Sequence, residues 1–197
     1  MTRTWSLQLL RSYYQNAYKE QFTDAENFPI SVGQAEYLLG ILRQFKLSRV
    51  MQLGAGYSTL ALGFWASQED AEIVSYADGA YWRDFMSGMV EEAFGSGTAA
   101  KIDFRPLSRV SEAEPDGSFD LALVGQGPSK NKRIEDIPWI VSSIREGGFA
   151  LFDDFSSRTR FANQVTRAAL ASGCQSVQWA EPDAYRTFGV ARRGAVQ

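Results

Sequence analysis

The hydrophobic positions of this chain repeat with two different periods, and each period marks one kind of element. Apolar residues three or four positions apart predict two helices near the N-terminus, over residues 5–20 and 31–45. The second helix begins at Ser31, with Gln34 three residues later, which is the spacing of a capping box. From residue 49 onward, short apolar runs alternate with helical patterns, as they do in α/β proteins.

The alternating region contains five predicted strands and four predicted helices. The strands are expected at residues 49–53, 72–77, 101–107, 119–124 and 147–154, and the helices at 58–68, 81–94, 136–144 and 159–171. Residues 95–99 (GSGTA) are expected to form a loop. The run FDLALV at 119–124 is almost wholly apolar, which is typical of a parallel strand covered on both faces.

The end of the chain breaks this alternation. Residues 174–180 and 186–193 both have strand character, but only EPDAY separates them, which is too short for a helical crossover. The two runs should therefore pair as an antiparallel hairpin. The prediction is an α/β fold with a doubly wound, Rossmann-like sheet of seven strands, mostly parallel, with an antiparallel C-terminal hairpin. Residues 1–28 are expected to form a separate helical segment beside a domain of residues 29–197.

Composition narrows the functional classes. The chain has 197 residues, 45% of them hydrophobic, and a net charge of −3, which argues against a broad nucleic-acid footprint. The single cysteine, Cys174, excludes an intrachain disulfide and a cysteine-rich zinc site. No apolar run is long enough to span a bilayer, and no signal-peptide pattern begins the chain. We therefore expect a cytoplasmic protein without a membrane or nucleic-acid partner.

The chain contains no histidine. This absence excludes Ser-His-Asp and Cys-His catalysis and any histidine-ligated metal. Acid–base chemistry would have to come from Asp, Glu, Lys, Tyr or the substrate.

A glycine turn follows the first predicted strand, in VMQLGAGYST at residues 50–59. Without a Cβ atom, Gly54 and Gly56 can adopt positive φ and let a ligand lie against the main chain. A dinucleotide site is one interpretation, but Thr59 stands where that motif requires a third small residue. A tight turn without any ligand is the other interpretation.

Several ordered segments resemble the class I S-adenosylmethionine-dependent methyltransferases. They are PISVGQAEYLLGIL, RVMQLGAGYSTLAL, FDLALVGQGPS, REGGFALFDDF and the terminal hairpin, which together cover residues 29–193. The resemblance is to the small-molecule O-methyltransferase-like branch, whose glycine motif ends in Tyr-Ser-Thr. It implies S-adenosylmethionine as the cofactor, a small molecule as the substrate, and a methyltransferase-like domain over residues 29–197.

The resemblance also implies roles for residues at the strand ends. Cofactor-binding residues would be Gln52, Leu53, Gly54, Ala55, Gly56, Tyr57, Ser58, Asp78, Leu107, Ser108, Gly125 and Gln126. Asp153 and Asp154, at the end of the fifth strand, would face the reaction centre, and one of them would act as the general base. Either carboxylate could instead cap the helix that follows.

Three positions depart from the family pattern. Gln52 is neutral where an acidic residue is usual, Ala77 occupies the ribose-binding position with Asp78 one place later, and Gly125 replaces a metal-binding Asp. We therefore expect no metal dependence, because hard cations need clustered oxygen ligands. The chain is either an active enzyme with an altered pocket, or an inactive protein of this fold that serves as a cofactor-binding or partner subunit. Cofactor binding would distinguish the two.

An aromatic set lies near the N-terminus, comprising Trp5, Tyr13, Tyr14, Tyr18 and Phe22. These side chains could close over the site as a substrate lid. Packing on the sheet or against a second subunit is the favoured interpretation, and a homodimer is one expected assembly.

Overall fold

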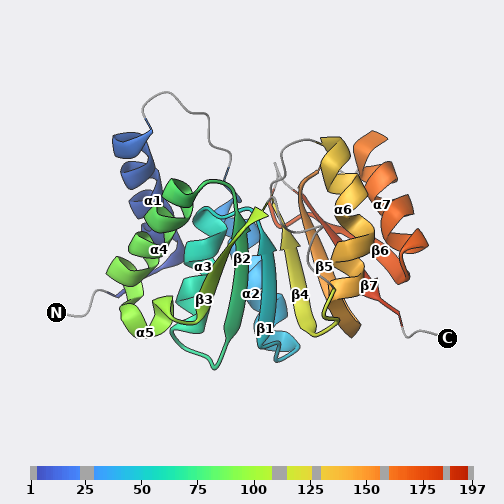
Figure 1. Ribbon diagram of the computed structural model, residues 1–197, viewed down its shortest axis with the longest axis horizontal. Helices are drawn as coiled ribbons and strands as arrows, with labels where there is room; N and C mark the ends of the chain where they lie inside the picture. The colour runs from blue at the N-terminus through green and yellow to red at the C-terminus, as the bar shows by residue number, and fades with distance from the viewer. Residues whose placement is uncertain are drawn as a thin grey trace.

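The seven-stranded sheet of the computed structural model follows the predicted order of elements (Figure 1). The structure describes residues 4–22, 29–107, 115–125, 130–155, 160–183 and 187–194, without the side chains of residues 130, 131, 154 and 155. The strands are β1 (Arg49–Leu53), β2 (Glu72–Ala77), β3 (Ile102–Pro106), β4 (Phe119–Val124), β5 (Ile144–Phe155), β6 (Cys174–Ala180) and β7 (Thr187–Arg193).

The strand order is β3-β2-β1-β4-β5-β7-β6. Strands β1 to β5 are parallel to one another, whereas β7 is antiparallel to both β5 and β6. The predicted Rossmann-like sheet with an antiparallel C-terminal hairpin is therefore confirmed. Strand β1 pairs with β2 on one side and β4 on the other, so the direction of winding reverses there. Such a reversal is where open α/β sheets bind their ligands.

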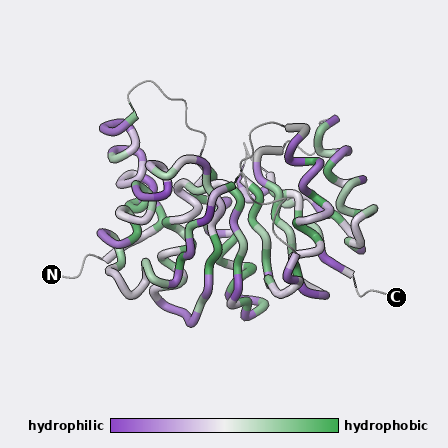
Figure 2. Tube along the Cα trace, in the orientation of Figure 1, coloured by the Kyte–Doolittle hydropathy of each residue, from purple (hydrophilic) through white to green (hydrophobic). Residues whose placement is uncertain are grey.

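Helices cover both faces of the sheet. One face carries α1 (Leu7–Gln21), α2 (Val32–Gln44), α3 (Tyr57–Ala66), α4 (Ala80–Phe94) and α5 (Ser96–Ala99), and the other carries α6 (Lys130–Ser143) and α7 (Arg160–Ala171). Side chains alternate between these layers: Val50 packs with the first group, and Met51 with α6 and α7. Hydrophobic residues accordingly concentrate along the central strands in Figure 2.

Three elements differ from the sequence prediction by more than two residues. The expected loop at 95–99 is wrong, because Ser96–Ala99 forms the short helix α5, entered from Gly95 at a φ of +87°. Helix α6 begins at Lys130 rather than residue 136, and it includes Pro138. Burial of Ile137, Ile140 and Val141 against the sheet keeps the helix together despite the missing proline N–H. Strand β5 begins at Ile144 instead of residue 147.

Within the described ranges, no helix combines the length and apolar character needed to cross a membrane.

Candidate functional site

The loop after β1 is fixed at the point where the sheet reverses its winding. Gly54 has a φ of +94°, which lies in the region that glycine adopts readily and other residues avoid. Its N–H donates to the Tyr76 carbonyl at 2.8 Å, and the Gly125 N–H donates to the Leu53 carbonyl at 3.0 Å. The carboxyl ends of β1, β2 and β4 are therefore hydrogen-bonded to one another.

Gln52, one of the implied cofactor-binding residues, is fully buried beneath this loop. Its Oε1 accepts hydrogen bonds from the hydroxyls of Thr59 at 3.1 Å and Ser75 at 3.2 Å. Its Nε2 donates to Ser58 Oγ at 2.6 Å. Both ends of the amide are thus bonded to the protein, and Gln52 connects β1 and β2 to the first turn of α3.

Thr59 has a role that the sequence analysis missed. Besides donating to Gln52, its Oγ1 accepts a hydrogen bond from the Gly56 N–H at 3.0 Å. The third residue of α3 therefore satisfies the N–H of the residue that precedes the helix, as in a capping box. The signal was present in the three-residue spacing of Gly56 and Thr59, but a glycine N-cap has no side chain to suggest it.

Helices α1 and α4 support the loop from the side. The Tyr57 hydroxyl donates to the Leu7 carbonyl of α1 at 2.8 Å, and Trp82 Nε1 donates to the Ala55 carbonyl at 3.2 Å. A Cβ atom at Gly56 would lie 3.3 Å from the hydroxyl oxygen of Tyr14, which is itself buried. Helix α1 is therefore packed against the glycine loop, in agreement with the packing interpretation of the aromatic set. A role of these aromatic side chains as a substrate lid stays a prediction.

Burial also fixes the protonation state of Tyr57. Desolvation raises the pKa of its phenol well above the usual range, more than the nearby Arg11 guanidinium lowers it. Tyr57 therefore remains a neutral hydrogen-bond donor across the physiological range and does not supply a base.

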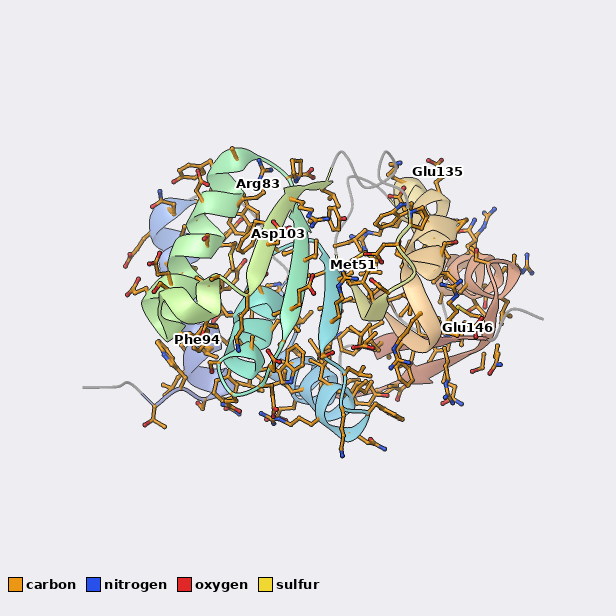
Figure 3. All side chains as sticks on the ribbon, turned by 60° about the horizontal axis from the view of Figure 1, so that its bottom comes forward. Met51, Arg83, Phe94, Asp103, Glu135 and Glu146 are labelled. Carbon is orange, nitrogen blue, oxygen red and sulfur yellow. The ribbon has the colours of Figure 1, made fainter. Side chains whose placement is uncertain are left out.

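The ends of β2, β3 and β4 place the remaining implied cofactor residues. Asp78 is exposed directly after β2. Arg83, labelled on α4 in Figure 3, donates to the Ala77 carbonyl at 3.1 Å. Leu107 and Gly125 are half-buried at the ends of β3 and β4. Ser108 and Gln126 lie outside the described residues. Asp78 thus presents a solvated carboxylate at the same edge of the sheet as the glycine loop.

Asp153, one of the two candidate bases, is 2% exposed near the end of β5. Its Oδ1 accepts a hydrogen bond from Gln34 Nε2 of α2 at 2.6 Å. Alternate residues of a strand point to the same face, so Asp153 is on the face of β5 that also carries Phe149 and Leu151. These two side chains pack in the same layer as α2, which agrees with the contact to Gln34. The backbone of Asp154 belongs to β5, but its side chain lies outside the described part of the chain.

Asp120 is another buried carboxylate, at the opposite end of the sheet. Its Oδ2 accepts hydrogen bonds from the N–H groups of Ser48 at 2.7 Å and Arg49 at 2.9 Å, and Arg145 pairs with Oδ1. Burial alone would raise the pKa of Asp120, but these hydrogen bonds and the guanidinium hold it below its usual range. Asp120 therefore stabilises the fold and is remote from the glycine loop.

Among the residues that the structure describes, no three His, Cys, Asp or Glu side chains are grouped so that they could hold a metal ion.

Comparison with known proteins identifies the fold but not a family. No protein-family model matches the chain, and no curated protein matches it. Among solved structures, cofactor-bound Rv0187 from MTB is 16% identical with a TM-score of 0.72, covering 95% of this chain and 91% of the other. The O-methyltransferase TomG from Streptomyces achromogenes, in complex with SAM, is 19% identical with a TM-score of 0.71, covering 99% and 92%.

The same fold also occurs with another chemistry. The [4+2]-cyclase SpnF is 14% identical with a TM-score of 0.68, covering 100% of this chain and 99% of that one. The chain therefore has the class I methyltransferase fold predicted from its motifs, and the fold alone does not determine the reaction.

Proposed function

We propose that this protein is an S-adenosylmethionine-dependent methyltransferase that modifies a small molecule at an oxygen atom without a metal ion. The observation that carries the proposal is the segment of residues 53–58, from the end of β1 through the glycine loop into α3, which lies at the winding reversal with Gly54 at positive φ. The likeness of the whole chain to TomG, which was solved in complex with SAM, supports the same assignment.

The residues at this edge of the sheet fit such a cofactor. The methionine part carries a carboxylate, which suits the N-terminal end of α3, because a helix N-terminus presents backbone N–H groups and positive partial charge. The exposed Asp78 carboxylate can accept hydrogen bonds from ribose hydroxyls. When bound, the cofactor would supply a methyl group on a positively charged sulfur.

We assign Gln52 a structural role, although relatives usually have an acidic residue at this position. Its amide binds Ser58, Thr59 and Ser75, so it holds the loop in place instead of offering a charge to the ligand. Desolvating a carboxylate in that buried position would cost far more than burying an amide whose two ends are both hydrogen-bonded. Negative charge toward the cofactor would come from Asp78.

The proposed base is Asp153 or Asp154. The hydrogen bond from Gln34 favours the ionised form of Asp153, the form that can take a proton from an acceptor hydroxyl. Because the chain has no histidine and Tyr57 is held neutral, we assign the proton transfer to one of these two carboxylates at the end of β5. The remaining task of the protein is to hold the two reactants in line.

Metal independence is supported by Gly125 at the end of β4. A glycine there supplies no carboxylate beside Asp153. A site for a hard cation would therefore lack one of the oxygen ligands that it needs.

Isothermal titration calorimetry of the full-length protein with S-adenosylmethionine, S-adenosylhomocysteine and NAD tests the proposal. We expect both sulfur compounds to bind and NAD not to bind. If the folded protein binds none of them at millimolar concentration, the proposal fails and the partner-subunit alternative replaces it. Binding of NAD instead would assign the glycine turn to a dinucleotide.

A further inference from the structure

The N-terminus of α2 contains a complete capping box. The Gln34 N–H donates to Ser31 Oγ, and the Ser31 N–H donates to Gln34 Oε1, both at 3.0 Å. Either glutamine or glutamate can serve at the third position of such a box, because only an acceptor oxygen is required. The helix cap alone therefore does not explain why this residue is an amide.

The other end of the Gln34 side chain explains the amide. The side chain is fully buried, and Nε2 donates to Asp153 Oδ1 at 2.6 Å and to the Thr187 carbonyl at 3.4 Å. Since Oε1 is held by the Ser31 N–H, the two hydrogens of Nε2 must point toward Asp153 and β7. A glutamate at position 34 would keep the cap, but one of its own carboxylate oxygens would then face the Asp153 carboxylate.

We infer that Gln34 is a positioning residue that holds Asp153 as an oriented, ionised acceptor at the carboxyl end of β5. Burial of Asp153 works against its charge, whereas the hydrogen bond donated by Gln34 and the nearby positive end of the α2 dipole both favour the charged carboxylate. The contact itself is independent of the proposed function, but its value for catalysis rests on that proposal.

Among the described residues, Asp183 and Arg11 are charged groups that contact this end of α2. Asp183, in the turn between β6 and β7, accepts a hydrogen bond from the Ser31 hydroxyl. Arg11 of α1 donates to the Ile30 carbonyl at 2.9 Å. The cap thus joins β5, the terminal hairpin and α1 around one amide side chain.

The test is a cycle of three variants: Gln34→Glu, Asp153→Asn, and the two combined. Gln34→Glu preserves the acceptor for the Ser31 N–H but forces two carboxylates to share a proton. In the double variant the new amide donates to the new carboxylate, so the pair is reversed and complementary. We expect the double variant to regain most of the melting temperature that Gln34→Glu loses.

The pH dependence separates this electrostatic effect from a general loss of packing. A carboxylate whose folded pKa is raised stabilises the fold below its unfolded pKa, and that contribution is lost as pH rises through the folded pKa. The melting temperature of Gln34→Glu should therefore fall further below wild type between pH 5 and pH 8, reaching a deficit of about 4–8 °C. Asp153→Asn in the wild-type background should show no such widening, because its amide can accept from Gln34.

Infrared spectroscopy gives a second readout that a purely structural role would not change. Gln34→Glu should show the carbonyl stretch of a protonated carboxylic acid at neutral pH, and the double variant should lack it. Gln34→Glu with a wild-type melting temperature at every pH and no such band would overturn the inference. Failure of the proposed function is seen separately, as absence of cofactor binding to the wild-type protein.

Discussion

Thr59 shows how a single hydroxyl can maintain a ligand loop. It receives the Gly56 N–H and donates to Gln52, so the loop, the first strand and α3 meet at one buried oxygen. Thr59→Val keeps the shape but leaves the Gly56 N–H without a partner. We expect a loss of about 1–3 kcal/mol in the free energy of unfolding, together with weaker cofactor binding, because the loop loses its anchor.

Thr59→Ser is the matched control, because it retains the hydroxyl and should retain most of the stability and the affinity. Chemical denaturation and calorimetry of both variants provide the measurements. Equal stability of Thr59→Val and Thr59→Ser would show that the hydroxyl does not hold the loop.

The two candidate bases make a prediction about turnover. Asp153→Asn and Asp154→Asn should differ in an assay of S-adenosylhomocysteine formation with phenolic and carboxylic acceptors. Substitution of the residue that acts as the base should lower the turnover rate by a factor of about 10²–10⁴. Cofactor affinity should stay nearly unchanged, because a general base acts on the acceptor's proton. Activity that survives both substitutions would remove these carboxylates from the mechanism. Loss of activity with EDTA and its recovery with Mg²⁺ would contradict metal independence.

At the scale of elements, the attachment of α1 to α3 depends on a neutral phenol. Burial raises the pKa of Tyr57, whereas in the unfolded chain a tyrosine ionises near about pH 10. The pKa of Tyr57 is raised on folding, so the contribution of this phenol to stability is complete below the unfolded pKa and is lost as pH rises above it. Tyr57→Phe should therefore reduce the slope of stability against pH above about pH 10, while also losing the bond to the Leu7 carbonyl.

Urea denaturation at several alkaline pH values measures this slope. Tyr18 and Tyr37 also have pKa values raised by burial, so part of the slope will remain in the variant. An unchanged slope in Tyr57→Phe would mean that this phenol ionises as easily in the folded protein as in the unfolded chain.

The elements themselves were largely predictable from the periodicity of apolar residues. Strand β4 followed directly from an apolar run that only Asp120 interrupts, and the terminal hairpin followed from a short connection. The prediction made helix α6 too short. Burial of its apolar residues holds the helix together around Pro138, and this packing is a tertiary effect that local sequence does not reveal. Helix α5 is only four residues long, so its sequence carries no measurable period.

At the scale of the whole molecule, sequence order predicted where the site lies but not how it is held. The winding reversal beside β1 follows from the order of strands, and the glycine turn marks it. The contact between Gln34 and Asp153 joins residues 119 positions apart, and no local pattern links them. The same holds for Tyr14 against Gly56, which depends on how α1 returns to the sheet.

The central claim is that S-adenosylmethionine binds against the segment of residues 53–58, which contains the glycine loop. The most direct measurement is calorimetric titration of S-adenosylhomocysteine into wild type, Gly54→Val and Gly40→Ala. Gly54 requires a positive φ that valine avoids, whereas a Cβ at Gly40, on the exposed side of α2, meets nothing within 4 Å. The account predicts binding to wild type and Gly40→Ala, with affinity at least about tenfold lower for Gly54→Val, a loss of about 1.4 kcal/mol. Folded wild-type protein that gives no heat of binding, or a Gly54→Val variant that binds as tightly as wild type, would contradict it.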